Sequence, residues 1–313
     1  MKQKISMAKT QNLNVEEAIE LFLRKAKIRN LSENTILTYQ CHLGIFCKYM
    51  DKEQPIERID EECVDGFIAY LKESSNVSEI TINTYLRTIR VFLYYCMDCN
   101  YIERYKIVMP KVGKKAKQTY TDEELRRLLK KPDPKKCTFA EFRIWVFENY
   151  LLGTGNRISS ALNVRIGDID FESASIFIRK TKNRKPQILP LSRTLACILK
   201  EYLEIRGGTE NDFLFCNVYG EQGNRRTFQQ EVRAYNIKRN VNKTSCHLFR
   251  HTFAKNWILA GGDIFRLQKI LGHSDLTVTR EYVEMFRTDL QQDFDQFNPL
   301  DRMQRNKDVI RMK

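Results

Sequence analysis

A basic segment from Arg104 to Gln118, RYKIVMPKVGKKAKQ, divides the chain into two parts. It contains no acidic residue, and its single proline and single glycine interrupt regular structure. At 313 residues the chain also exceeds the usual size of one domain. We therefore expect a first domain over residues 12–103, a linker over 104–118, a second domain over 119–298 and a tail over 299–313.

Four helical patterns, each preceded by a polar capping residue, predict the first domain. Asn14 and Glu17 have the spacing of a capping box, in which each side chain binds the backbone of the other. Ser32, Asp60 and Ser78 precede the other three apolar patterns. The expected structure of this region is a small four-helix domain.

The second domain combines helical patterns with three short strand patterns. Thr121 and Glu124 form another capping box, and residues 139–152 are apolar on all sides. Strand patterns follow at 168–171, 175–178 and 187–191. Two more helical patterns come after them, at about 193–205 and about 226–239. The expected fold class is mainly α with a small antiparallel β-sheet, in two domains.

Charge and cysteine usage limit the classes of partner and compartment. The formal net charge of +14 favours a polyanionic partner, because neutralising phosphates releases their condensed counterions. Nucleic acid is favoured, and an anionic membrane surface is the alternative. No apolar stretch reaches the length of a membrane span, and the basic amino terminus lacks the apolar region of a secretory signal. Nine scattered cysteines, an odd number, predict reduced thiols and a cytoplasmic location.

Histidines cluster in the stretch CHLFRHTFAKNWILAGGDIFRLQKILGHSDLTVTREYV, residues 246–283. Three of the chain's four histidines, His247, His251 and His273, lie there, followed by Tyr282. If residues 247–260 are helical, His247 and Arg250 share one face, where an imidazole beside a cation suits an oxyanion. A glycine ends the next helical pattern just before His273, which places that side chain at a helix terminus.

A metal site and an ordinary surface are the alternatives for this stretch. His247 and His251 are four residues apart and Cys246 is adjacent, as in some zinc sites. The His-Glu-x-x-His pattern is absent, however, and no second cysteine lies nearby. We therefore expect no metal.

The order and spacing of these residues resemble the carboxy-terminal signature of the tyrosine recombinases, also called the phage integrase family. The matching phrases are HLFRHTFA from His247, ILGHSD around His273, and Tyr282 nine positions after His273. The resemblance implies an enzyme that breaks and rejoins DNA through a 3′-phosphotyrosine and a Holliday junction. It implies no cofactor, and the chain has neither a phosphate-binding glycine loop nor an acidic metal cluster.

Two further catalytic positions follow from the resemblance. Arg157, in the phrase TGNRISSALNV, matches the family's first catalytic arginine, although Ser160 stands where an acidic residue is usual. Lys182 matches the family's hairpin lysine when counted back from the Leu-Pro-Leu strand, with Lys180 and Lys185 as alternatives. The expected catalytic set is therefore Arg157, Lys182, His247, Arg250, His273 and Tyr282.

The chemistry requires help for the tyrosine, because a phenol with a pKa of ~10 is a poor nucleophile at neutral pH. We expect the two arginines to hold the nonbridging phosphate oxygens and to stabilise the charge of the transition state. We expect His247 to accept the phenolic proton, His273 to donate to the phosphate, and the hairpin lysine to protonate the departing 5′ oxygen.

Exposed polar residues in both domains and in the linker are expected to contact DNA. The first domain resembles the core-binding domain of the family. The expected DNA contacts are Thr35, Thr38, Asn83, Arg87, Arg90, Lys114, Lys115, Arg225, Arg226 and Arg233. The expected partner is double-stranded DNA carrying recombination sites. The amphipathic segment 289–297 resembles the helix that family members exchange within a tetramer, and accessory proteins are further expected partners.

The leading functional hypothesis is a site-specific recombinase that integrates or excises a mobile element. A Xer-like enzyme that resolves dimers is the alternative with the same chemistry. A type IB topoisomerase shares the chemistry too, but the small helical first domain argues against it. A catalytically idle DNA-binding protein of the same fold is the alternative from another class.

Overall fold

The chain folds into two compact units that divide between residues 115 and 116. The structure is a computed structural model, and it describes residues 13–74, 77–113, 117–181, 185–273, 275, 279 and 282. The division falls inside the segment 104–118 that we expect to link two domains. Among the described helices, none combines the length and the apolar character that crossing a membrane requires.

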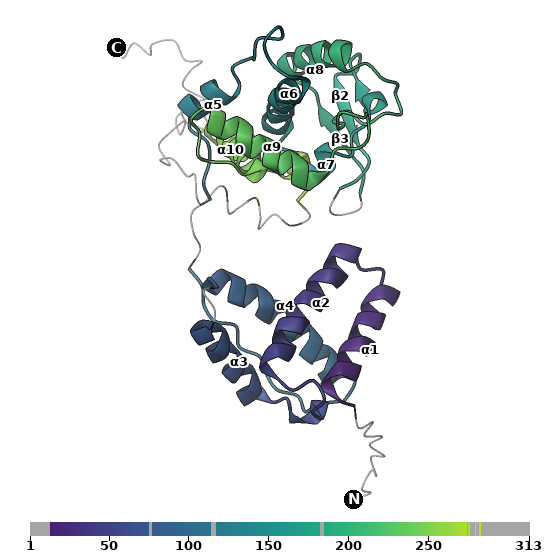
Figure 1. The fold of residues 1–313 in the computed structure, drawn as a ribbon, viewed down its shortest axis with the longest axis vertical. Helices are drawn as coiled ribbons and strands as arrows, with labels where there is room; N and C mark the ends of the chain where they lie inside the picture. Colours follow the sequence, from purple (N-terminus) through teal and green to yellow (C-terminus); the bar gives the residue numbers. More distant parts are fainter. Residues whose placement is uncertain are drawn as a thin grey trace, which may run out of the picture. The chain divides into compact units, whose positions relative to one another are not determined.

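In the part of the first unit that the structure describes there are four α-helices, α1 to α4 in Figure 1, and one short 3₁₀ helix. The capping residues predicted at Asn14, Ser32 and Ser78 are confirmed, because each side chain accepts a hydrogen bond from the first turn of its helix. Asp60 likewise accepts from the backbone nitrogen of Cys63. The elements are α1 (Val15–Ile28), α2 (Glu33–Tyr49), η1 (Ile56–Arg58), α3 (Glu61–Ser74) and α4 (Glu79–Asp98).

Aromatic side chains form much of the core of the first unit. Phe46, Phe67 and Phe92 are fully buried, and Phe22 packs against Phe92 with ring centroids 5.6 Å apart. The helices α1, α2 and α4 pack against one another, and α3 packs against α2 and α4. This unit therefore has a hydrophobic core of its own.

The second unit contains the remaining helices and a three-stranded antiparallel sheet in the order β1-β2-β3. Ile176 of β2 pairs with Ile169 of β1 and with Leu189 of β3. The predicted fold class, mainly helical with a small antiparallel sheet, is confirmed. The elements are α5 (Asp122–Leu128), α6 (Phe139–Thr154), α7 (Ile158–Ala161), η2 (Ile166–Asp168), β1 (Ile169–Asp170), β2 (Ser175–Ile178), β3 (Gln187–Pro190), α8 (Arg193–Arg206), α9 (Arg225–Lys238), α10 (Cys246–Leu259) and α11 (Ile264–Leu271).

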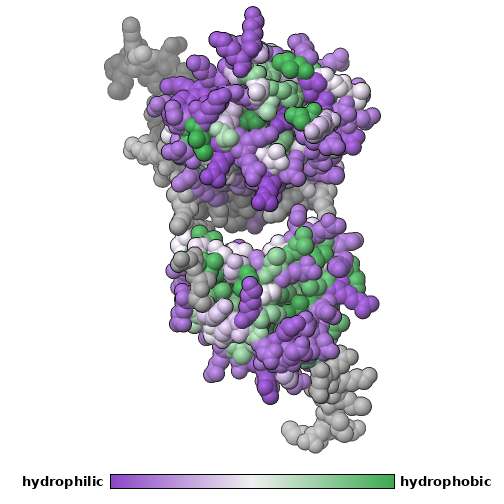
Figure 2. Space-filling model, viewed as in Figure 1, coloured by the Kyte–Doolittle hydropathy of each residue, from purple (hydrophilic) through white to green (hydrophobic). Residues whose placement is uncertain are grey.

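The helix α6 is the centre of the second unit and packs against α8, α9 and α10 (Figure 1). Its residues are buried around the whole circumference, as the continuous apolar pattern predicts, including Phe142, Trp145 and Phe147. The visible surface of the unit is largely hydrophilic, with small apolar patches (Figure 2). α6 ends at Gly155 in the left-handed conformation, with φ of 64°, which glycine adopts at low cost. This turn directs the chain into α7 and so positions Arg157.

Candidate active site

Arg250 of α10 is a buried cation that connects three segments of the second unit. Its guanidinium is 3% exposed and donates to the carbonyl oxygens of Gly155, at 2.9 Å, and Leu271, at 2.7 Å. It also donates to Nε2 of His273 at 2.7 Å. Burial and the nearby charge of Arg157 lower the pKa of Arg250 to about 10, so it remains protonated at neutral pH. These contacts fix the direction of the guanidinium.

The contacts of His273 determine which of its nitrogens carries the proton. An arginine can only donate, so Nε2 of His273 must accept the hydrogen bond from Arg250. The remaining proton is then on Nδ1, which lies 3.0 Å from the hydroxyl oxygen of Thr279. Burial lowers the pKa of His273 to about 4, in agreement with a neutral ring. His273 follows Gly272, which ends α11 in the left-handed conformation, as predicted.

Tyr282 is inserted among these side chains and is 2% exposed. Its hydroxyl oxygen lies 2.7 Å from Nδ1 of His251, and its ring stacks on that of His273 with an interplanar angle of 5°. The ammonium group of Lys117 lies 4.2 Å from the centroid of the tyrosine ring, which is a cation–π contact. The phenol is thus held between groups that are neutral or positive.

Arg157 is the second arginine of the site. It is the N-cap residue of α7 and comes two residues after Gly155, whose carbonyl binds Arg250. Burial lowers the pKa of Arg157, whereas its interaction with Tyr282 opposes that shift. Among the residues that the structure describes, none forms a hydrogen bond or ion pair with this guanidinium. Ser160, where family members usually have an acid, is buried.

His247 and His251 lie one helical turn apart on α10, with ring centroids 5.4 Å apart. Burial, with the charges of Arg250 and Arg157 next, lowers the pKa of His247. Burial lowers the pKa of His251 to about 4. Both rings are therefore neutral at pH 7, so that the positive charge of the site comes from its arginines and Lys117.

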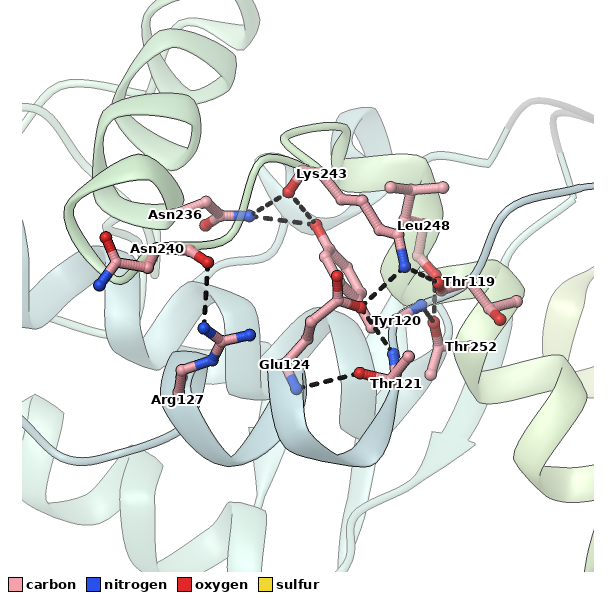
Figure 3. A network of polar contacts seen from close by, with 10 residues as sticks. All are labelled: Thr119, Tyr120, Thr121, Glu124, Arg127, Asn236, Asn240, Lys243, Leu248 and Thr252. Carbon is pink, nitrogen blue, oxygen red and sulfur yellow. Dashed lines mark hydrogen bonds and ion pairs between the residues drawn. The ribbon is translucent and has the colours of Figure 1, made fainter.

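A polar network fixes the first residues of the second unit to α9 and α10 (Figure 3). The backbone nitrogen of Tyr120 donates to Thr252 of α10 at 2.9 Å, and its hydroxyl donates to the carbonyl oxygen of Lys243 at 3.1 Å. Lys243 in turn binds Glu124 at 2.8 Å. Glu124 and Thr121 form the predicted capping box at the start of α5. The network therefore holds the segment after Lys117 against the helix that bears the histidines.

The structure brings five of the six predicted catalytic residues together. These are Arg157, His247, Arg250, His273 and Tyr282, which interact through the contacts and charges described above. Lys182, the sixth, lies outside the described residues, as do Lys114, Lys115 and the segment 289–297.

Most of the predicted DNA contacts that the structure describes lie on helix surfaces. On α9, Arg225, Arg226 and Arg233 are exposed, and the charge of Arg225 contributes to the low pKa of His247. In the first unit, Thr38 and Arg87 are exposed, and Thr35, Asn83 and Arg90 are partly exposed. Asn83 already has a partner, because its amide donates to the carbonyl oxygen of Pro110 at 3.0 Å.

Sequence reasoning assigned no function to His251 or Lys117, although both contact Tyr282. His251 was visible inside the phrase HLFRHTFA, next to Arg250, and its position four residues after His247 placed it on the same side of the helix. Lys117 was one of several cations in a basic segment, and nothing local distinguishes it.

Comparison with known families assigns both units. The model of the phage integrase family matches residues 118–288, and that of the phage integrase N-terminal SAM-like domain matches residues 19–100. The chain belongs to the phage integrase family. The resemblance to tyrosine recombinases drawn from the sequence is thereby confirmed.

Individual relatives extend over nearly the whole chain. Tyrosine recombinase XerD of Staphylococcus haemolyticus is 29% identical over 302 residues, which cover 91% of this chain and 99% of the relative. The Staphylococcus aureus protein of the same name is 27% identical over 298 residues, with coverages of 91% and 99%.

Two solved structures of recombinases share the fold. The Tn1549 transposon integrase in complex with transposon right end DNA has a TM-score of 0.71 at 20% identity, covering 90% of this chain and 99% of that one. The XerH site-specific recombinase bound to difH substrate in a pre-cleavage complex has a TM-score of 0.67 at 25% identity. The coverages there are 89% and 82%.

Proposed function

We propose that this protein is a site-specific DNA recombinase that cuts and rejoins strands through a covalent bond between Tyr282 and a 3′ phosphate. The observation that carries the proposal is the meeting of the Tyr282 phenol with the charges of Arg157 and Arg250. Two guanidiniums beside one phenol suit a phosphodiester that a tyrosine attacks. Relatives named tyrosine recombinase and the DNA-bound XerH structure support it.

In the proposed reaction, the bond from the tyrosine oxygen to phosphorus forms while the bond from phosphorus to the 5′ oxygen breaks. Arg157 and Arg250 bind the nonbridging oxygens and stabilise the negative charge that develops on them. Arg250 needs no reorientation for this, because its three hydrogen bonds already fix it. Lys182 protonates the departing 5′ oxygen, and the phosphotyrosine conserves the bond energy for rejoining.

Two histidines of the expected catalytic set, His247 and His273, act on the phosphate and on Arg250. His247 lies near Arg157 and Arg250 and is placed to contact the phosphate. His273 supports Arg250 through Nε2 in the structure, and the resemblance implies that it also donates to the phosphate. The chemistry of this set requires no metal and no nucleotide cofactor.

The DNA partner is a duplex that carries recombination sites. The net charge of +14 favours binding to phosphates. Arg225 and Arg226 are exposed at the start of α9, and the charge of Arg225 acts on His247. In the proposed assembly, a homotetramer exchanges the segment 289–297 between neighbours and accessory proteins assist it. The reaction serves integration and excision of a mobile element, or Xer-like dimer resolution. A relative named tyrosine recombinase XerD supports the second of these, and the shared fold of a transposon integrase supports the first.

A nicked suicide duplex tests the proposal. The short fragment that carries the freed 5′ hydroxyl dissociates after cleavage, so rejoining is blocked and the covalent intermediate is trapped. We expect the wild-type protein to become covalently joined to the 3′ phosphate at the end of the cleaved strand. Tyr282→Phe is expected to retain DNA binding and form no adduct. Tyr219→Phe is the matched control, since Tyr219 is 84% exposed and the same hydroxyl is removed there. Retention of DNA without any wild-type adduct would instead identify a catalytically idle DNA-binding protein.

A further inference from the structure

We infer that His251, rather than His247, is the catalytic residue that accepts the phenolic proton of Tyr282. The inference rests on the proposed function and deepens it, because it assigns the first proton transfer of the reaction. It departs from the expectation drawn from the sequence, in which His247 had this role.

The geometry of the phenol oxygen favours His251. Nδ1 of His251 lies 2.7 Å from that oxygen, within the range of a direct proton transfer, and the ring centroids are 5.6 Å apart. Arg250 also interacts favourably with the phenol. Because arginine has only donors, it leaves the phenolic proton free to point at Nδ1. His251 must then carry its ring proton on Nε2.

The charges around the pair favour a proton acceptor that is neutral at rest. Burial, followed by the electrostatic effects of His247, Lys117 and Arg250, lowers the pKa of His251 to about 4. Nδ1 therefore has a free lone pair at neutral pH. Among the described residues, the titratable groups that face the pair are His247 and Arg250 on α10, Arg157 before α7, Lys117 before α5, and His273, which stacks on the tyrosine.

The cations Lys117 and Arg250 have opposite effects on the charged forms of His251 and Tyr282. They oppose a positive charge on the imidazole, but they stabilise the negative charge that develops on the phenol oxygen. Lys117 lies over the ring, and Arg250 interacts electrostatically with the phenol, so both favour the phenolate. The phosphodiester, when it binds, adds negative charge that favours protonation of His251.

The proposed step balances in protons and electrons. The phenolic proton moves to Nδ1 of His251, and the electron pair of the tyrosine oxygen forms the bond to phosphorus. The 5′ oxygen leaves with the electron pair of the bond that breaks and receives a proton from the hairpin lysine. In rejoining, the steps reverse, and His251 returns its proton to the tyrosine oxygen.

The test compares His251→Asn with His247→Asn in full-length protein, using single-turnover adduct formation on the suicide duplex. The asparagine oxygen can accept a hydrogen bond near the position of Nδ1 but cannot take the proton. We expect His251→Asn to slow adduct formation by about 100-fold or more at pH 7, as for loss of a general base. Thermal unfolding and DNA binding are measured in parallel to show that the variant is folded.

Three further readouts separate proton transfer from positioning. The rate of His251→Asn is expected to rise with pH between about 6 and 8, whereas the wild-type rate changes little, because ionisation of the phenol replaces the missing base. A 5′-bridging phosphorothiolate, whose thiolate leaves without a proton, is expected not to rescue His251→Asn. Replacement of Tyr282 by a fluorinated tyrosine, which ionises more readily, is expected to restore much of the rate.

The inference is overturned if His251→Asn retains a rate within about threefold of wild type. It is also overturned if the rate is lost but follows the wild-type pH profile and fluorination does not help, since His251 then only positions the ring. A loss confined to His247→Asn with the predicted pH profile would return the role to His247. Failure of the wild-type protein to form any adduct would contradict the proposed function instead.

Discussion

Separate replacement of Arg157 and Arg250 by alanine distinguishes what each arginine does for catalysis from what it does for stability. Arg250 is 3% exposed and donates three hydrogen bonds, to Gly155, Leu271 and His273. Hydrogen bonds from a charged donor contribute about 1.5–3 kcal/mol each, and their loss leaves buried acceptors without a partner. These contributions are not additive, so we expect Arg250→Ala to lower the free energy of unfolding by about 3–5 kcal/mol.

Arg157 is partly exposed, and none of the described residues pairs with its guanidinium. We expect Arg157→Ala to change the free energy of unfolding by less than about 1 kcal/mol. Both variants are expected to slow adduct formation by at least about 100-fold, the usual effect of removing one preorganised donor. For Arg157→Ala that loss is then purely catalytic.

Urea unfolding followed by tryptophan fluorescence measures this difference. The chain has two tryptophans, Trp145 of α6 and Trp257 of α10, so the signal reports on the second unit alone. An Arg250→Ala protein as stable as the wild type would refute the structural role of the three hydrogen bonds. An Arg157→Ala protein that forms adduct at a rate within about tenfold of wild type would refute the proposed phosphate clamp.

Three other variants test separate features. Glu148 is buried without a hydrogen-bond partner among the described residues, and burial raises its pKa. Because its folded-state pKa exceeds the unfolded-state value, the stability of the wild type falls as pH rises above the unfolded-state value. Glu148→Gln should therefore have a higher urea midpoint than the wild type, by a difference that grows from pH 5 to 8. Gly155→Ala should cost about 1–3 kcal/mol in urea unfolding, because φ is 64° and a Cβ would lie 2.7 Å from the Phe253 ring; an unchanged midpoint would contradict the strain. Arg226→Gln should reduce the slope of log binding constant against log salt by about 0.9, and an unchanged slope would exclude a phosphate contact.

Local signals in the sequence predicted the helix boundaries well. Ser32, Ser78 and Thr121 all cap helices as expected, because an N-cap depends only on the residue and the first turn that follows it. The apolar character of residues 139–152 likewise predicted a buried α6. These features need no knowledge of the rest of the fold.

The residues of the site could be predicted only where the order and spacing of residues along the chain identify them. Arg157, Arg250 and Tyr282 were found from matching phrases, but the contact between Tyr282 and His251 depends on how the chain returns to α10 across 31 residues. Helical spacing alone gave no reason to prefer His251 over His247 as the contact of Tyr282. Lys117 could not be singled out, because its contact with the ring depends on the anchoring of Tyr120 to Thr252.

That anchoring decides where hybrid enzymes can be joined. A chimera that takes its first unit from one relative and its second from another must keep Tyr120 and Glu124 with the Lys243 and Thr252 that bind them. A crossover placed just before Lys117 preserves all these pairs within one parent. A crossover a few residues later, after Glu124, would leave each pair with partners of different ancestry.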